Sequence, residues 1–405
     1  MTGEILFLAH RVPYPPDRGD KIRSWHMLRR IAAIAPTHVV ALCDDPRDMA
    51  HLGVIENVAA SVMIAPRKVT KAQAVARALL TGKPASVCAF SSGAVQTQVD
   101  HLLATRPIRT IFAYSGQMAQ FIPRDLGGRR FVMDFVDMDS AKFSAYAQGT
   151  SGLSAWAQRG EGKRLFNFEK TVANRSTTSL FVSADEAALF REASGLGEDR
   201  VGFIENGIDL DVYDPAIARD SVITGKGPLI VFTGQMDYRP NVEAVEGFAR
   251  NSLSMIRACH PQTRFAIVGR NPTQQVTALA KLPGVIVTGE VADTRDWLAA
   301  ADVVVAPLKL ARGIQNKVLE AMAMAKPVVV SPAAAQGIDA RHERDFMIAQ
   351  GPGLQADAVI TLLDKPVLAH ALGNAARAQM VARYSWDTRL AGLAGLLGFE
   401  ANGPW

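Results

Sequence analysis

The sequence predicts an α/β protein made of two doubly wound domains with parallel sheets. Short apolar runs of the kind buried inside parallel sheets alternate along the chain with stretches whose apolar residues recur at helical spacing. The length of 405 residues is too great for one compact core, which indicates two domains. Several of the apolar runs end in glycine, where a ligand can approach the backbone at the carboxyl edge of a sheet.

The first domain is expected to cover residues 1–215. Strand-like runs are predicted at Ile5–Ala9, Val39–Cys43, Ala60–Ile64, Thr110–Tyr114 and Ser179–Ser183, with two more beginning at Phe131 and Val201.

The loop His10–Lys21, between the first strand and a helix expected to begin near Lys21, is long and rich in proline and glycine. Because ligands of open α/β sheets bind where strands end and loops lead into helices, Gly19, Asp20 and Arg23 are candidate binding residues. The loop contains no Gly-x-Gly-x-x-Gly fingerprint, so it does not predict a dinucleotide.

Acidic residues alternate with apolar ones where the strand from Phe131 ends, at Asp134, Asp137 and Asp139. The glycine and terminal glutamate of a calcium loop are missing, so the pattern does not predict a calcium site. Two interpretations remain: Asp139 or Ser140 caps the next helix, or Asp137 is a site residue.

The second domain is expected over residues 216–384, after a linker of turn-like composition. It opens with an apolar strand at Leu229–Thr233, then Gly234, and then a helix begun by Arg239 and Pro240. The same pattern of a strand followed by glycine recurs at Arg264–Gly269 and at Val285–Gly289. The loops after Gly234, Gly269 and Gly289 are therefore candidate ligand-binding loops, and the second of them begins with Arg270.

The most informative stretch is Ala301–Val330, which predicts strand, loop, helix and strand. Its helix is expected to begin at Gln315 and to end before Pro327. A helix start carries unpaired N–H groups and partial positive charge, so it suits a diphosphate. Lys317 would add a full charge in the first turn, and Glu320, one turn further on, suits a ribose diol. The alternative is an ordinary crossover whose lysine and glutamate are merely solvated.

Composition narrows the function classes. A hydrophobic content of 48% and a charged content of 20% are those of a globular domain, and no apolar run is long enough to predict a transmembrane helix. The N-terminus shows no signal-peptide pattern, so we expect a cytoplasmic protein. The three cysteines lack metal-ligand spacing, and we predict no metal site. The net charge of +5 favours acidic small ligands, an anionic membrane surface or simple solvation, and nothing indicates nucleic acid.

One amphipathic segment, Val69–Leu80, combines basic residues with Val75, Ala78, Leu79 and Leu80. It either rests on anionic lipid headgroups as a peripheral membrane contact or packs on its own domain as a surface helix.

The stretch Asn316-Lys317-x-x-Glu320-x-Met322-Ala323-x-x-x-Pro327 resembles the donor-binding signature of family 4 of the retaining glycosyltransferases. The resemblance implies the GT-B architecture, in which two Rossmann-like domains face each other across a cleft. It also implies that Glu320 holds the nucleotide ribose. The family's first glutamate falls on Arg312 in this chain, and the family histidine that contacts the transferred sugar falls near Val136.

The resemblance implies further site residues. The loop with Gly19 and Asp20 would face the donor phosphates and the acceptor as part of the catalytic centre, and Asp137 would substitute for the family histidine. The donor-binding set that it implies is Gly234, Arg239, Arg270, Gly289, Val291, Gln315, Asn316, Lys317 and Glu320.

Three segments narrow the resemblance to the sugar transferases of exosortase-associated exopolysaccharide systems. They are Tyr114–Met118, Asp134–Ser140 and Arg312–Lys317. Tyr384-Ser-Trp386 is similar to the signature before the family's terminal helix, which implies that residues 385–405 complete the first domain. The implied reaction moves a sugar from a nucleotide diphosphate sugar to a saccharide acceptor, expected to be lipid-linked, with retained configuration and without metal or cofactor.

Two alternatives belong to other functional classes. A nucleotide-sugar 2-epimerase of the same fold would need acids and histidines placed in both domains. A non-catalytic nucleotide-sugar-binding protein is suggested by the missing first glutamate and histidine. A dehydrogenase is excluded by the missing dinucleotide fingerprint.

Overall fold

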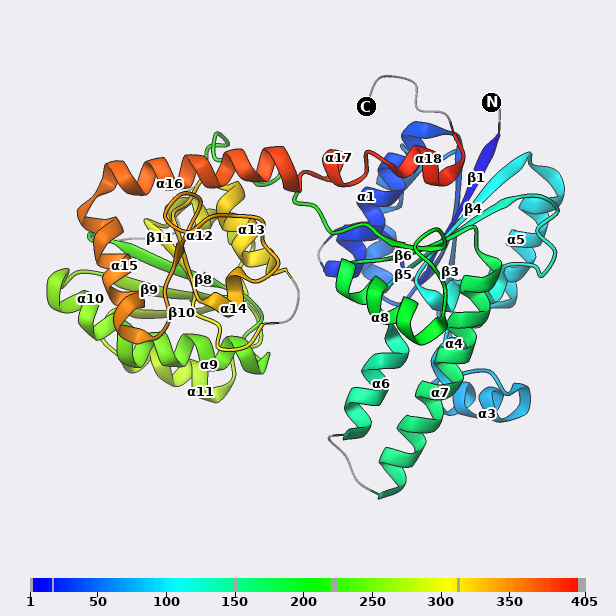
Figure 1. Cartoon of the computed structure of the whole chain (residues 1–405), viewed down its shortest axis with the longest axis horizontal. Helices are drawn as coiled ribbons and strands as arrows, with labels where there is room; N and C mark the ends of the chain where they lie inside the picture. The colour runs from blue at the N-terminus through cyan, green and yellow to red at the C-terminus, as the bar shows by residue number, and fades with distance from the viewer. Residues whose placement is uncertain (1–2, 17, 149–151, 220–224, 312–313, 400–405) are drawn as a thin grey trace. The chain divides into compact units, whose positions relative to one another are not determined.

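The computed structural model describes residues 3–16, 18–148, 152–219, 225–311 and 314–399, and it contains two compact units (Figure 1). Unit 1 comprises Met1–Asn206 and Arg389–Trp405, and unit 2 comprises Gly207–Thr388. The expected boundary at 215 therefore falls inside unit 2. The reason is that Arg377 of unit 2 donates hydrogen bonds to the carbonyls of Leu210 (3.3 Å) and Tyr213 (2.6 Å).

Unit 1 is built on a seven-stranded sheet in the order β3-β2-β1-β4-β5-β6-β7, with every described pairing parallel. The order reverses beside β1, so β1 and β4 flank a topological switch point, where α/β sheets bind ligands. The strands are β1 (Glu4–Ala9), β2 (Thr37–Cys43), β3 (Ser61–Pro66), β4 (Ile108–Tyr114), β5 (Arg130–Val136), β6 (Thr178–Phe181) and β7 (Val201–Phe203).

The helices of unit 1 follow the strands that they connect. They are α1 (Gly19–Ile34), α2 (Leu52–Glu56), α3 (Lys71–Thr81), α4 (Ala85–Cys88), α5 (Gly93–Thr105), α6 (Asp139–Gln148), α7 (Gly152–Arg175), α8 (Ala184–Ser194) and α18 (Leu393–Leu397). Figure 1 shows α6 and α7 extending away from the sheet; α4 lies beside α7, and α3 lies beside α4.

Unit 2 is built on a six-stranded parallel sheet in the order β10-β9-β8-β11-β12-β13, which also reverses at its middle. The strands are β8 (Leu229–Thr233), β9 (Arg264–Val268), β10 (Val285–Gly289), β11 (Val303–Ala306), β12 (Val328–Val330) and β13 (Met347–Ile348). The helices are α9 (Arg239–Gly247), α10 (Leu253–Cys259), α11 (Gln274–Ala278), α12 (Thr294–Ala300), α13 (Asn316–Ala323), α14 (Pro332–Ala335), α15 (Pro352–Asp364) and α16 (Pro366–Gln379).

The predicted doubly wound α/β class is confirmed in both units. Strands β1, β8 and β11 are buried along almost their whole length, which explains their unbroken apolar composition. Within the described residues after α16, which end at Phe399, the chain does not form one continuous helix. A four-residue helix α17 (Trp386–Arg389) and the short α18 follow α16, and α18 ends at Gly398 in the left-handed conformation.

Helix α3 contacts unit 1 through its small residues. Only Ala74 and Ala78 of this helix are buried, whereas Val75, Leu79 and Leu80 are exposed. The helix therefore packs on its own domain through its two alanines, as one alternative expects, and its larger apolar residues face outward. Among the described residues, no helix combines the length and the apolar character needed to cross a bilayer.

Candidate functional site

Helix α13 places Lys317 and Glu320 at the carboxyl edge of the unit 2 sheet. The helix buries Val318, Leu319 and Met322 against the core, and this orientation leaves Lys317 and Glu320 partly exposed at its margin. Lys317 stands in the first turn, beside the partial positive charge of the helix start. The predicted positions of the two residues, one turn apart at a helix start, are confirmed.

The ammonium group of Lys317 is held by two neighbours from the strand and helix opposite. Its Nζ donates a 2.5 Å hydrogen bond to Oδ1 of Asn241 and lies 4.3 Å from the centre of the Phe232 ring. Burial lowers the pKa of Lys317 to about 8, although the nearby Glu320 opposes the shift. Within the protein, a partly desolvated cation thus stands beside a helix start, an arrangement that attracts an anion.

The strand ends of β8 and β9 carry glycines where other atoms approach closely. A Cβ atom on Gly234 would lie 2.8 Å from Nδ2 of Asn241 and 3.1 Å from Nζ of Lys317. A Cβ atom on Gly269 would lie 1.7 Å from the carbonyl oxygen of Gly234. The structure therefore brings Gly234 and Lys317 together, and the glycine at each strand end is required by close approach.

Glu320 has a partner that sequence reasoning missed. The hydroxyl of Tyr213 hydrogen-bonds the Glu320 carboxyl group, and burial raises the pKa of that carboxyl although Tyr213 and Lys317 both oppose the shift. Tyr213 escaped notice because its segment was assigned to the first domain. Asn241 was missed too, and its one signal was a polar residue placed next to Pro240 at a helix start.

The remaining predicted donor residues lie around this centre with different exposures. Gln315 precedes α13 as its N-cap residue, and Asn316 is exposed at its first position. Arg270 is exposed, while its carbonyl accepts a 2.9 Å hydrogen bond from the amide of Met236.

At the end of β10, Gly289 adopts the left-handed conformation. Val291, two residues later, is partly buried and packs against the core of unit 2. Arg239 points its guanidinium group to Glu243 (2.7 Å) on the exposed side of α9. Arg312, at the position of the family's first glutamate, lies outside the described residues.

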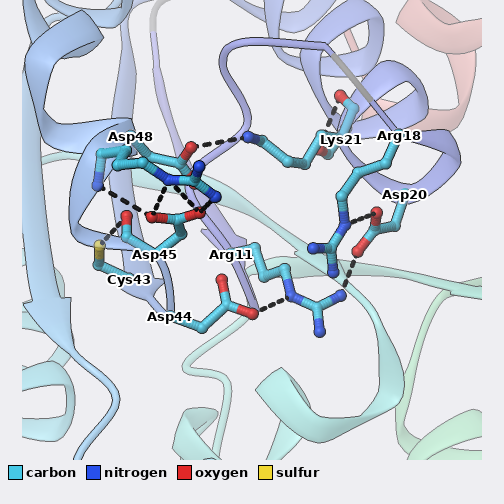
Figure 2. Close-up of polar contacts among 10 residues, drawn as sticks. Arg11, Arg18, Asp20, Lys21, Cys43, Asp44, Asp45 and Asp48 are labelled. Atoms are coloured by element: carbon cyan, nitrogen blue, oxygen red, sulfur yellow. Dashed lines mark hydrogen bonds and ion pairs between the residues drawn. The ribbon is translucent and has the colours of Figure 1, made fainter. Parts of the chain in front are cut away.

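In unit 1, a network of ion pairs occupies the carboxyl ends of β1 and β2 and the start of α1. Figure 2 shows Arg11 between two carboxylates, with its Nε 2.6 Å from Asp44 and its Nη1 paired to Asp20. Arg18 also donates to Asp20, over 3.0 Å.

The network determines the charge state of Asp20. Burial alone would raise the pKa of this carboxyl, but hydrogen bonds from His10, Arg18 and Arg11 outweigh it and hold the pKa well below its ordinary value. Asp20 is therefore a fixed anion rather than a proton donor. Gly19, the first residue of α1, is exposed with open space around its Cα.

The acids at the end of β5 separate into a buried and a surface set. Asp134 is fully buried and pairs with the fully buried Arg23 (3.0 Å), which also donates to the carbonyl of Ile204. Arg23 is therefore a buried link that joins α1 to β5 and to the segment that follows β7. Asp137 lies at the surface, where Nζ of Lys142 contacts it over 2.8 Å. Val136, which directly precedes Asp137, has a φ of 70°, which is rare for a β-branched side chain.

The first turn of α6 is capped by glutamates from elsewhere in the chain. The amide of Ser140 donates to Glu169 (3.2 Å) and the amide of Met138 donates to Glu186 (2.8 Å). Asp139 and Ser140, which the sequence offered as caps, are the first two residues of α6 itself, and the hydroxyl of Ser140 also donates to Glu169. Among the described residues, no group of three or more potential ligand side chains is arranged to hold a metal ion.

Comparison with known proteins shows which proteins this chain is similar to. Residues 227–365, which include Lys317 and Glu320, match the family described as glycosyl transferases group 1. The chain is 25% identical over 335 residues to D-inositol 3-phosphate glycosyltransferase 2 of Catenulispora acidiphila, covering 77% of this chain and 75% of that relative. It is 27% identical over 162 residues to the phosphatidyl-myo-inositol mannosyltransferase of Propionibacterium freudenreichii subsp. shermanii, covering 40% and 39% of the two chains.

Among solved structures, HepE of Anabaena in complex with UDP shares the fold over 98% of this chain and 99% of its own, with a TM-score of 0.64 and 16% identity. The two Rossmann-like units are thus those of the GT-B fold. The match over the α13 region and the likeness to named transferases confirm the resemblance drawn from the Asn-Lys-x-x-Glu motif. The protein is a glycosyltransferase, and its second unit carries a glycosyl transferase group 1 domain.

Proposed function

We propose that this glycosyltransferase takes its sugar from a nucleoside diphosphate sugar bound at the start of α13. The observation that carries the proposal is the pairing of a partly desolvated Lys317 with Glu320, one helical turn apart and each held by its own partner. The lysine supplies the charge that a diphosphate needs. The glutamate supplies the acceptor oxygens that a ribose diol needs.

Each group has a distinct task in the proposed reaction. As the bond between the sugar and the diphosphate breaks, negative charge grows on the leaving phosphate, and Lys317 with the first amides of α13 stabilises it. These groups are already oriented in the protein, because Asn241 and Phe232 hold the ammonium group. Tyr213 orients Glu320 in the same way. No metal or cofactor takes part in this proposal, and the sugar retains its anomeric configuration.

The acceptor is proposed to be a saccharide, linked to a lipid and bound by unit 1. The network of Arg11, Asp20 and Asp44 offers fixed carboxylate and guanidinium groups of the kind that hydrogen-bond sugar hydroxyls. One relative carries the name of a phosphatidyl-myo-inositol mannosyltransferase, which supports a lipid acceptor. We propose a role in the synthesis of exopolysaccharide or another cell-surface glycan, at the inner face of the cytoplasmic membrane.

A thermal-shift experiment tests the donor site. The protein is melted with UDP, GDP, ADP and dTDP sugars, and UDP sugars head the panel because HepE was solved with UDP. One nucleotide is expected to raise the melting temperature, and Glu320→Ala is expected to abolish the rise. Glu243→Ala, which removes an exposed glutamate of α9, serves as the matched control.

The result also decides the donor assignment. No stabilisation by any nucleotide sugar, or equal stabilisation of the protein and Glu320→Ala, would contradict it. Hydrolysis or transfer measured with the stabilising donor then distinguishes a transferase from a protein that only binds the donor.

A further inference from the structure

Helix α3 is attached to unit 1 by a very small contact. Its buried residues are Ala74 and Ala78, one turn apart, and they form a small cluster with Cys88. Both ends of the helix are nevertheless well formed. Thr70 and Gln73 exchange reciprocal hydrogen bonds at its start, and the amide of Gly82 donates to the carbonyl of Ala78 (2.9 Å) at its end. The helix is therefore an ordered element.

The face of α3 that points away from the domain is apolar. At about 100° per residue, Ala76 lies opposite the buried alanines, and Val75, Leu79, Ala72 and Leu80 lie on either side of it. The exposed fractions are 52% for Val75, 78% for Leu79 and 87% for Leu80. A surface helix of a globular domain normally turns its polar face outward, so α3 has the reverse orientation.

Positive charge surrounds this apolar face. No aspartate or glutamate occurs between Glu56 and Asp100, an interval that holds five basic residues. All five are exposed: Arg67, Lys68, Lys71, Arg77 and Lys83. Lys71 and Arg77 flank the apolar face on its two sides, where a helix lying in a membrane surface would place its cations. The combination of outward leucines with surrounding basic side chains is complementary to an anionic bilayer.

We propose that α3 is the membrane-binding element of this protein. It lies in the plane of an anionic lipid surface, with Val75, Leu79 and Leu80 in the acyl boundary and the basic residues at the phosphate groups. The proposal rests on the membrane location given under the proposed function, and it identifies the surface of the protein that contacts the membrane. It does not depend on donor binding.

Vesicle sedimentation of the full chain tests the proposal. Binding is measured on vesicles of phosphatidylcholine alone and of phosphatidylcholine mixed with phosphatidylglycerol. We expect binding to the mixed vesicles only, weakened by salt. The variant Leu79→Ser/Leu80→Ser is expected to bind at least about tenfold more weakly, because it removes two side chains from the apolar boundary.

A matched control removes two other highly exposed apolar residues, which lie in unit 2. Leu354→Ser/Val367→Ser changes side chains that are 60% and 83% exposed on α15 and α16, and it should bind vesicles like the unaltered protein. Lys71→Gln and Arg77→Gln should each weaken binding about fivefold on anionic vesicles. In the variant Leu80→Trp, the indole emission should shift to shorter wavelength on the mixed vesicles.

Other outcomes overturn the proposal. Loss of binding in the Leu354→Ser/Val367→Ser variant but not in the α3 variant would place the membrane surface elsewhere, and no binding to anionic vesicles would exclude it. A dimer that dissociates in Leu79→Ser/Leu80→Ser, seen by sedimentation velocity without vesicles, would assign the face to a second copy of the chain. The melting-temperature rise with donor should be the same in the α3 variant, so failure here is distinguishable from failure of the donor site.

Discussion

The ammonium nitrogen of Lys317 lies 4.3 Å from the centre of the Phe232 ring. The ring belongs to β8 and the lysine to α13, so the contact joins the central strand of unit 2 to the start of the helix that carries the family motif. It places the lysine where water is partly excluded, which lowers its pKa and strengthens its attraction for an anion.

We predict that donor binding weakens as the pH rises through about 8, because the lysine loses its charge there. At pH 7, Lys317→Gln should bind the donor about 10- to 100-fold more weakly, and it should show no change in affinity over the same pH range. Isothermal titration at several pH values measures both effects. An unchanged affinity in the variant would remove Lys317 from the donor site.

The lowered pKa of Lys317 also makes the free energy of unfolding depend on pH, in the opposite direction to donor binding. A lysine whose folded-state pKa is below its unfolded value of 10.5 disfavours the folded state while it is charged. Without donor, the free energy of unfolding should therefore rise between pH 8 and 10.5 relative to that of Lys317→Gln.

Removing the hydroxyl of Tyr213 should act on Glu320 alone. In Tyr213→Phe, the carboxyl loses its hydrogen bond, its pKa rises further and its orientation is less restricted. We expect the affinity for the donor to fall about tenfold, with the melting temperature of the free protein changed little. Tyr14→Phe, in unit 1, is the control and should bind donor normally. Equal affinities in the two variants would contradict the positioning role.

Two glycine substitutions should differ in severity. Gly269→Ala would place its Cβ 1.7 Å from the Gly234 carbonyl oxygen, and we expect it to destabilise the protein by more than about 4 kcal/mol. Gly289 has a φ of 69° but open space around it, so Gly289→Ala should cost only about 1 kcal/mol. Thermal unfolding of both variants checks the order. A milder effect at Gly269 would mean that β8 and β9 can separate at their ends.

Glu169 should make stability depend on pH in the acidic range. Burial raises its pKa to about 7, although the amide and hydroxyl of Ser140 oppose the shift. Between the ordinary value of 4.5 and pH 7, the folded protein holds a proton that the unfolded chain lacks, so stability falls as the pH rises through this window. Glu169→Gln should remove a dependence on the order of 3 kcal/mol, measured by denaturant unfolding at several pH values.

The control for this prediction is Glu192→Gln, which changes an exposed glutamate of α8. Its pH dependence should match that of the unaltered protein. A slope that persists in Glu169→Gln would assign the titration to another buried group.

Arg239→Ala tests the outer part of the donor site. The side chain of Arg239 is 87% exposed and pairs with Glu243, so its loss should change the free energy of unfolding by less than about 0.5 kcal/mol. If Arg239 leaves Glu243 and contacts the diphosphate of the donor, Arg239→Ala should bind donor several-fold more weakly. Glu243→Ala should bind donor as the unaltered protein does. The melting temperature with and without donor measures both quantities, and unaltered donor binding would limit Arg239 to the surface ion pair.

Local sequence was sufficient to predict the doubly wound class and the positions of Lys317 and Glu320. Periodicity within one element determines which of its residues are buried. The sequence alone therefore predicts the strand from the run Val303–Ala306, and it predicts the buried helix face from the spacing of Val318, Leu319 and Met322. The resemblance to glycosyltransferases rested on the same short motif.

The partners of these residues depend on segments far apart in the chain, and only the folded arrangement shows them. Asn241 and Phe232 lie beside Lys317 because β8 and β11 are neighbours in the sheet, and Tyr213 reaches Glu320 because its segment packs on unit 2. Burial, charge state and pKa arise from such long-range contacts. The outward direction of Leu79 and Leu80 was undetermined for the same reason: an amphipathic pattern identifies an apolar face, but the surroundings decide what that face meets.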